Sequence, residues 1–256
     1  MIITGNWISR YEAFYSIYTA KHPKCKFITV QHGAYVGGNI TLSSHKYCRS
    51  DIFLTWGSNF SEKFKTLNSL KNIEVIDFGN PLYNAKNRDK YKYQKNKVKR
   101  VLIANSGVTK VGSENLLKLI RKLSRLNIEV HLKMHPHQEK KFGRIDLSDV
   151  KVIRAKQDSR ILESNLYDVV ISDHSTFLLD AIFYKKKVIY FPQFDRGKDF
   201  HKNLYSDFLD PLELDFFHAK NGMNCIYDLV SIEAQEALLA KAITLQKGNI
   251  HYPFYN

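Results

Sequence analysis

The chain has 256 residues, which is enough for two α/β domains with ordinary hydrophobic cores. Its hydrophobic content of 44% excludes a disordered chain, and its formal net charge of +14 indicates an acidic partner such as nucleic acid, an anionic membrane or a phosphorylated substrate. The three cysteines have no disulfide or metal-site spacing, and the N-terminus resembles neither a signal peptide nor a membrane span. We therefore expect a cytoplasmic protein, at most peripheral on the inner face of the cell membrane, with no metal site.

Residues 1–84 are predicted to form the N-terminal domain, because short apolar runs alternate there with helical patterns. A helix is expected from just after Gly5-Asn6 to about Lys21, with an apolar face that includes Tyr11, Phe14 and Tyr18. A second helix is expected at 58–70. The predicted strands are 1–4, 25–31, 51–56 and 73–78.

The strand 25–31 runs directly into His32-Gly33, and Gly37-Gly38 follow shortly after. Open parallel sheets build their sites at the carboxyl ends of the strands. Glycines at such a point allow positive φ and a close approach of the backbone. His32 is therefore a candidate site residue, with a purely structural histidine as the alternative.

The segment 85–99 loses the apolar period and is strongly basic. It is predicted to be a solvated linker between two domains or an exposed basic loop. Contact of Lys86 to Arg100 with anionic lipid head groups is an alternative. No reader motif for nucleic acid accompanies the charges, so nucleic acid is not expected as a partner. The basic residues, which face only Asp89, are Lys86, Arg88, Lys90, Lys92, Lys95, Lys97 and Lys99.

Residues 100–256 are predicted to form a second α/β domain with a more regular pattern. Its expected strands are 101–104, 128–134, 150–153, 167–172 and 187–191, and its expected helices are 112–126, 159–165, one between 176 and 187, and 232–247. The strand 128–134 contains Lys133 and ends at His135-Pro136. Because proline fixes the backbone there, His135 is presented from a stiff turn.

The stretch 167–191 is predicted to be a βαβ unit with two parallel strands. A polar corner from Asp173 to Thr176 opens its helix, where unpaired N–H groups and the helix dipole favour an anion. The hydroxyls of Ser175 and Thr176 add donors, so a phosphate is the expected ligand. The alternative is that Ser175 or Thr176 only caps the helix.

Taken together, these strand-end motifs resemble those of bacterial GT-B transferases that build cell-surface polymers. The likeness is nearest to the CDP-glycerol glycerophosphotransferases (teichoic acid polymerases and primases), and capsule and polysialic acid glycosyltransferases are similar. The motifs are Gln31-His32-Gly33, Lys133-Met134-His135-Pro136 and Ser172-Asp173-His174-Ser175-Thr176. The resemblance implies an α/β fold of two Rossmann-like parallel-sheet domains, of which the N-terminal one is expected to be truncated or reduced.

The resemblance also implies the chemistry. A glycerol-phosphate or glycosyl group would pass from a nucleotide-activated donor, such as CDP-glycerol, to a hydroxyl of a cell-surface polysaccharide or teichoic-acid-like acceptor, which is often lipid-linked. No metal and no further cofactor are implied. The implied residues are His32 as general base, His135 as donor to the leaving phosphate, Ser175, Thr176, Asp173 and Lys133 at the donor phosphates, and Gly33, Gly37 and Gly38 in the acceptor-side loop.

Two other functions stay open from the sequence. One keeps the fold but changes the chemistry, to a glycosyltransferase using a CMP- or UDP-sugar or to a sugar-nucleotide epimerase. The other is a non-enzymatic basic module that binds a membrane or nucleic acid through Lys86 to Arg100. His174 stands where a tyrosine is frequent in the family, which leaves base or ribose stacking at that position open.

Overall fold

The computed structural model describes residues 1–5, 10–31, 49–66, 72–80, 82–94, 98–105, 110–134, 152–154, 159–172, 176–190 and 232–245. In this part of the chain there are two compact units. The described residues of unit 1 are those within Met1–Asn87 and from Ala237 onward, and the described residues of unit 2 are those between Arg88 and Glu236. The division differs from the expected one, since the described part of 88–99 groups with unit 2 and residues from Ala237 onward group with unit 1.

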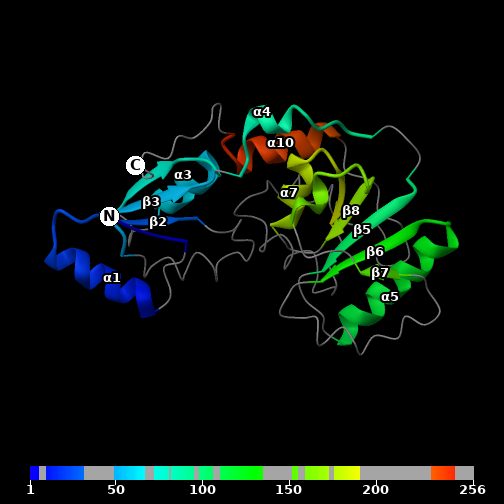
Figure 1. Ribbon diagram of the computed structural model, residues 1–256, viewed down its shortest axis with the longest axis horizontal. Helices are drawn as coiled ribbons and strands as arrows, with labels where there is room; N and C mark the ends of the chain where they lie inside the picture. The colour runs from blue at the N-terminus through cyan, green and yellow to red at the C-terminus, as the bar shows by residue number, and fades with distance from the viewer. Residues whose placement is uncertain are drawn as a thin grey trace. The chain divides into compact units, whose positions relative to one another are not determined.

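Unit 1 contains a four-stranded, fully parallel sheet in the order β1-β2-β3-β4 (Figure 1). Parallel sheets have both faces covered, and the three buried residues of β2 in succession fit this arrangement. Phe64 of α3 packs edge-on against Phe53 of β3, with 4.8 Å between the ring centroids. The elements are β1 (Ile2–Thr4), α1 (Arg10–Lys21), β2 (Phe27–Val30), β3 (Ile52–Thr55), α3 (Ser58–Thr66), β4 (Glu74–Asp77) and α4 (Ala85–Arg88).

The helix α1 forms where the sequence predicted it, but its orientation differs from the one that its aromatic spacing suggests. Tyr11 is 70% exposed and Phe14 is 62% exposed, whereas Glu12 and Thr19 are buried. The Thr4 hydroxyl donates to Glu12 Oε1 at 2.7 Å, which satisfies the buried carboxylate. The apolar face that the sequence predicts is therefore largely exposed at Tyr11, Phe14 and Tyr18.

Unit 2 contains a five-stranded parallel sheet in the order β7-β6-β5-β8-β9. The chain starts in the centre, proceeds to one edge, and returns to the other side of β5. This is a doubly wound sheet. Both units are therefore built on a parallel sheet, and the predicted α/β class is confirmed. The elements are β5 (Arg100–Asn105), α5 (Lys110–Arg125), β6 (Glu129–Met134), β7 (Val152–Arg154), the 3₁₀ turn η4 (Ser159–Leu162), β8 (Val169–Ser172), α7 (Phe177–Phe183) and β9 (Lys187–Tyr190). The helix α10 (Ile232–Ala242) contributes to both units.

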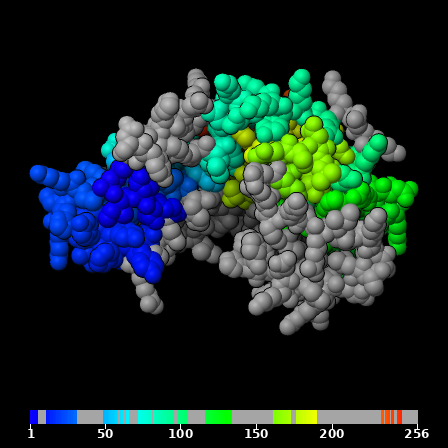
Figure 2. Space-filling view, viewed as in Figure 1, coloured from blue at the N-terminus to red at the C-terminus, as the bar shows by residue number. Residues whose placement is uncertain are grey.

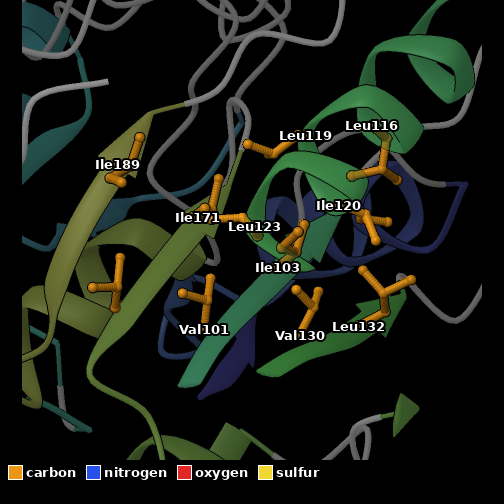
Figure 3. Packing of buried hydrophobic residues seen from close by; sticks show 11 residues of the cluster. Val101, Ile103, Leu116, Leu119, Ile120, Leu123, Val130, Leu132, Ile171 and Ile189 are labelled. Atoms are coloured by element: carbon orange, nitrogen blue, oxygen red, sulfur yellow. The ribbon is translucent and has the colours of Figure 1, made fainter. Parts of the chain in front are cut away.

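The core of unit 2 lies between α5 and one face of this sheet. Figure 3 shows the aliphatic side chains of α5 above those of the strands. The intervening strand residues Leu102, Val170 and Val188 are fully buried on the opposite face, because successive side chains alternate. The core residues are Val101, Ile103, Leu116, Leu119, Ile120, Leu123, Val130, Leu132, Val169, Ile171 and Ile189.

The helix α7 ends in a Schellman motif. Lys185 has a φ of 56°, its N–H donates to Ile182 O, and the N–H of Lys186 donates to Ala181 O. The side chains of these lysines are used elsewhere in unit 2, since Lys185 Nζ pairs with Glu236 at 2.8 Å and Lys186 Nζ donates to Ser164 O at 2.7 Å. The two lysines therefore make specific tertiary contacts and also place positive charge near the end of the helix.

The basic segment after Asn84 is not simply a solvated linker. Arg88 pairs with Glu236, and the Tyr93 hydroxyl donates to Glu236 Oε1 at 2.7 Å. Burial raises the pKa of Glu236, but the hydrogen bonds from Arg88, Lys185 and Tyr93 outweigh it, so the pKa is lowered overall. Arg88 and Tyr93 of this segment are therefore bonded within unit 2. Four lysines of the segment are nonetheless solvent-exposed: Lys86, Lys90, Lys92 and Lys99.

None of the helices in the described ranges is long and apolar enough to cross a bilayer.

Candidate functional site

The carboxyl edge of the unit 2 sheet brings two of the predicted motifs to the same level. Ala104 of the central strand β5 is the register partner of both Lys133 in β6 and Ser172 in β8. Strands in a sheet are about 4.8 Å apart, so β6 and β8 end roughly 10 Å from each other. The strand order reverses between β5 and β8, so the chain leaves β8 toward Asp173 at this point and leaves β6 toward His135 on the other side of β5. This switch point is where open α/β sheets bind ligands.

The side chain of Lys133, near the end of β6, contacts the first residue of α7. Its Nζ lies 4.9 Å from the centroid of the Phe177 ring, which is a cation–π distance. Burial lowers the pKa of Lys133, while the carboxylate of Asp180 partly opposes this effect. A half-buried ammonium held by a ring face is suited to an anionic ligand, because an anion would compensate for its lost hydration.

Thr176 lies directly before α7, which begins at Phe177, within the range expected from the sequence. The Thr176 carbonyl accepts hydrogen bonds from the N–H groups of Leu179 and Asp180, at 2.9 and 3.2 Å. Its hydroxyl makes no capping hydrogen bond to the helix. The alternative that Thr176 caps the helix through its side chain is therefore wrong. Thr176 directly precedes Phe177, whose ring contacts the Lys133 ammonium, so the end of β6 and the start of α7 meet at Phe177.

The sequence placed Ser172 in a motif at this edge, but it did not indicate the contacts that Ser172 and Phe177 make. The Ser172 hydroxyl is buried and donates to Ala104 O at 2.7 Å, so it ties β8 to β5 and is not a ligand group. Phe177 supports the Lys133 ammonium. An aromatic residue directly after a polar helix start is a weak signal, because apolar first-turn residues usually only pack in the core.

The other predicted site residues lie outside the described residues. In the second domain these are His135, Asp173 and Ser175, and in the first domain they are His32, Gly33, Gly37 and Gly38. The residues that precede them are described. Gln31, which is buried, follows β2 and donates its N–H to Leu54 O at 2.9 Å.

A second polar cluster lies at the opposite, amino-terminal edge of the unit 2 sheet. His131 Nδ1 is 2.9 Å from the Tyr167 hydroxyl, and its Nε2 is 2.6 Å from Glu129 Oε1. Glu129 Oε2 accepts from Arg100 at 2.9 Å. Hydrogen bonds from Arg100 and then His131 lower the pKa of Glu129 to about 2. The residues pair with one another between the strand starts, which identifies the cluster as structural. No group of three metal-ligating side chains occurs among the described residues.

Comparison with known proteins agrees with the fold. No protein-family model matches the sequence, and no curated protein matches it either. The H444N variant of the wall teichoic acid polymerase TagF matches with a TM-score of 0.51 at 15% identity, covering 88% of this chain and 65% of the polymerase chain. A glycosyltransferase from Rickettsia africae ESF-5 matches with a TM-score of 0.47 at 15% identity, covering 91% of this chain and 70% of that one. Arabidopsis thaliana UGT89C1 complexed with UDP-L-rhamnose matches with a TM-score of 0.47 at 14% identity, over 90% and 60% of the two chains.

The chain thus shares the fold of the wall teichoic acid polymerase TagF at low sequence identity. The chain spans about two thirds of the length of the polymerase it matches. Over the described ranges the fold is therefore α/β with two parallel sheets, of four and five strands, as in the two Rossmann-like domains of GT-B proteins.

Proposed function

We propose that the protein is a GT-B type transferase that uses a nucleotide-activated donor. The observation that carries the proposal is the shared level of Lys133 and Ser172 on the two sides of β5. Two motifs separated by almost forty residues thereby leave the sheet on either side of β5, next to the switch point where a nucleotide would bind. The Lys133 ammonium between the end of β6 and the start of α7 supports the same proposal.

In the proposed reaction, the acceptor hydroxyl attacks the phosphorus that carries glycerol in CDP-glycerol. The bond from that phosphorus to the bridging oxygen breaks, and CMP leaves. Lys133, with Ser175 and Thr176, would hold the donor phosphates, and Asp173 would complete the corner. His135 would donate a proton or a hydrogen bond to the leaving phosphate.

The acceptor side is assigned to the first domain. His32 would take the proton of the acceptor hydroxyl, a task that suits the pKa of an imidazole. Gly33, Gly37 and Gly38 would form the loop that borders the acceptor. The acceptor class is a surface polysaccharide or a teichoic-acid-like polymer.

The donor can be identified by thermal-shift measurements with CDP-glycerol, CMP-sugars and UDP-sugars. Binding stabilises a folded protein in proportion to the logarithm of ligand concentration over Kd. We expect CDP-glycerol to raise the melting temperature, with CMP giving part of the shift. A shift with UDP-sugars alone would favour sugar transfer, in which the acceptor attacks an anomeric carbon. No shift with any nucleotide would contradict the transferase.

The site itself is tested by comparing Lys133→Met with Lys118→Met. Lys118 is an exposed lysine of α5 and serves as the matched control. Loss of a charge-assisted contact is worth about 1.5–3 kcal/mol, so Lys133→Met should weaken donor binding roughly 10- to 100-fold while Lys118→Met leaves it unchanged. Isothermal titration calorimetry measures both. In turnover assays His135→Ala and His32→Ala should each lose activity by orders of magnitude, and near wild-type rates for both would contradict the mechanism.

We also propose that the protein contacts an anionic membrane surface through its exposed basic segment. Lys86, Lys90, Lys92 and Lys99 are exposed, whereas Arg88 and Arg100 pair with carboxylates of unit 2. Each basic residue near such a surface contributes about 1 kcal/mol. Reversal of the four lysines to glutamate should abolish co-sedimentation with anionic liposomes. Unchanged sedimentation would contradict this contact and leave the transferase proposal intact.

A further inference from the structure

The residue before His32 is held by two hydrogen bonds from a single tryptophan. The backbone N–H of Trp56 donates to Gln31 Oε1 at 2.8 Å, and its indole Nε1–H donates to Gln31 O at 2.6 Å. Both residues are buried, with Gln31 2% exposed and Trp56 6% exposed. Trp56 follows β3 directly, as Gln31 follows β2, so the two bonds join the carboxyl ends of neighbouring strands.

Trp56 is itself fixed from other sides within unit 1. Its carbonyl accepts the N–H of Thr244 at 2.7 Å. Its ring lies edge-on to the buried ring of Tyr83, with 6.0 Å between the centroids. The Thr244 hydroxyl in turn donates to Asp77 Oδ2 at 2.9 Å. A tryptophan with so many constraints has one orientation, which it imposes on Gln31.

The contact to Gln31 O has a direct covalent consequence. This oxygen belongs to the peptide unit that joins Gln31 to His32, and the atoms of a peptide unit from one Cα to the next lie in one plane. A donor to this oxygen therefore restrains rotation of the peptide plane that follows Gln31. The hydrogen bond from the Trp56 N–H to Gln31 Oε1 restrains the Gln31 side chain as well.

We infer that Trp56 is a positioning residue that sets the peptide plane from which His32 is presented to the acceptor. The inference rests on the proposed function, because His32 is the base only in that proposal. The side chains of Trp56 and Gln31 are assigned no contact with substrate. Their role is to hold the end of β2 against the end of β3.

The direct test observes the His32 ring by two-dimensional NMR of protein labelled at histidine. The His32 cross-peak is identified by its loss in His32→Gln. We expect Trp56→Phe, which keeps a ring but removes the indole donor, to shift and broaden this cross-peak. Gln31→Met, which removes the Oε1 acceptor, is the second variant and should act in the same direction. An unmoved His32 cross-peak in a folded Trp56→Phe or Gln31→Met protein would overturn the inference.

A control separates positioning from general loss of stability. Phe64 is buried in the same unit and packs on Phe53, but makes none of these hydrogen bonds. Phe64→Leu should therefore lower the melting temperature and leave the His32 cross-peak in place. If Phe64→Leu moves the cross-peak as much as Trp56→Phe does, the effect is structural and the inference fails.

Turnover with CDP-glycerol gives a second readout. Misplacement of a catalytic group by about 1 Å can cost 100-fold, so Trp56→Phe should lower kcat at least about 10-fold. KM for the donor should be unchanged, because the proposed donor site consists of other residues. If His32→Ala keeps full turnover while the NMR shift is present, the proposed base fails and the positioning by Trp56 stands. If His32→Ala is inactive and Trp56→Phe is fully active, the positioning role fails and the base stands.

Discussion

The helices α1 and α5 show two ways in which a helix lies beside a parallel sheet. The helix α5 in unit 2 buries Leu116, Leu119, Ile120 and Leu123 against the strands. The helix α1 in unit 1 buries Glu12 and Thr19 and leaves its aromatic residues largely exposed. In Figure 2 the blue N-terminal segment that contains α1 lies at the surface, on the side of the molecule that faces the viewer.

The difference follows from how apolar side chains are distributed around each helix. In α5 they occupy one stripe and the remaining positions are mostly charged or polar, so only one orientation buries them. In α1 apolar residues occur nearly all round, and local contacts decide the orientation. Thr4 satisfies Glu12, the Thr19 hydroxyl donates to Tyr15 O at 3.0 Å, and the Tyr15 ring packs edge-on against Phe27. An apolar spacing alone therefore does not determine which side of a helix is buried.

The largest expected effect concerns the α5 core. Ile120 is completely buried in the centre of the cluster, so Ile120→Ala should destabilise unit 2 by about 2–5 kcal/mol through lost burial and the cavity left behind. Urea unfolding followed by hydrogen exchange in peptides from α5, β5 and β6 resolves the change within this unit. Lys118→Ala on the exposed side of the same helix is the control and should stay within about 0.5 kcal/mol. A loss below about 1 kcal/mol for Ile120→Ala would contradict the packing in Figure 3.

A smaller effect on stability is expected for a pair of glutamates, one in each unit, that are each the first residue of a strand. Glu129 opens β6 in unit 2 and pairs with Arg100 and His131, while Glu74 opens β4 in unit 1 and is exposed. Because the folded pKa of Glu129 is lowered to about 2 from 4.5, its contribution to stability is present above pH 4.5 and is lost as the pH falls toward 2. The side chain is one third exposed, so solvent screening limits the contribution to about 1 kcal/mol.

Glu129→Gln should therefore destabilise unit 2 at pH 7 and have no effect near pH 2. Urea midpoints measured between these pH values give the comparison. Glu74→Gln should show little change at either pH. Equal pH dependence for the two variants would indicate that the Arg100 pairing contributes nothing.

Most of the fold could be predicted from the sequence because its strands are short apolar runs that end at polar or glycine-containing turns. The strands of unit 2 follow their apolar runs closely, and α5 follows its single stripe. The grouping of residues from Ala237 with unit 1 could not be predicted, because it depends on tertiary contacts such as the bond from Thr244 N to Trp56 O. No local pattern encodes such a contact.

The candidate site could be predicted at the level of strand ends but not of contacts. Parallel pairing places Lys133 and Ser172 at one level, as expected for motifs at the ends of parallel strands. The partner of Lys133 is an aromatic ring, and Ser172 binds the neighbouring strand. Nor does the sequence indicate that Trp56 holds Gln31, because a tryptophan after a strand is usually a core residue. These pairings depend on which strands are neighbours, a property of the whole sheet.

The smallest expected effect is the one that bears most directly on α1. Phe14 is 62% exposed, so Phe14→Ala removes little buried surface, and alanine has the higher helix propensity by a few tenths of a kcal/mol. We therefore expect a neutral to slightly stabilising change, within about 0.5 kcal/mol, in the urea unfolding of unit 1. Tyr15→Ala on the same helix is the matched comparison, since the Tyr15 ring packs on Phe27 and its loss should be clearly destabilising. If Phe14→Ala costs as much as Tyr15→Ala, the aromatic side of α1 is buried in solution, and α1 would bury its aromatic stripe as α5 buries its leucines.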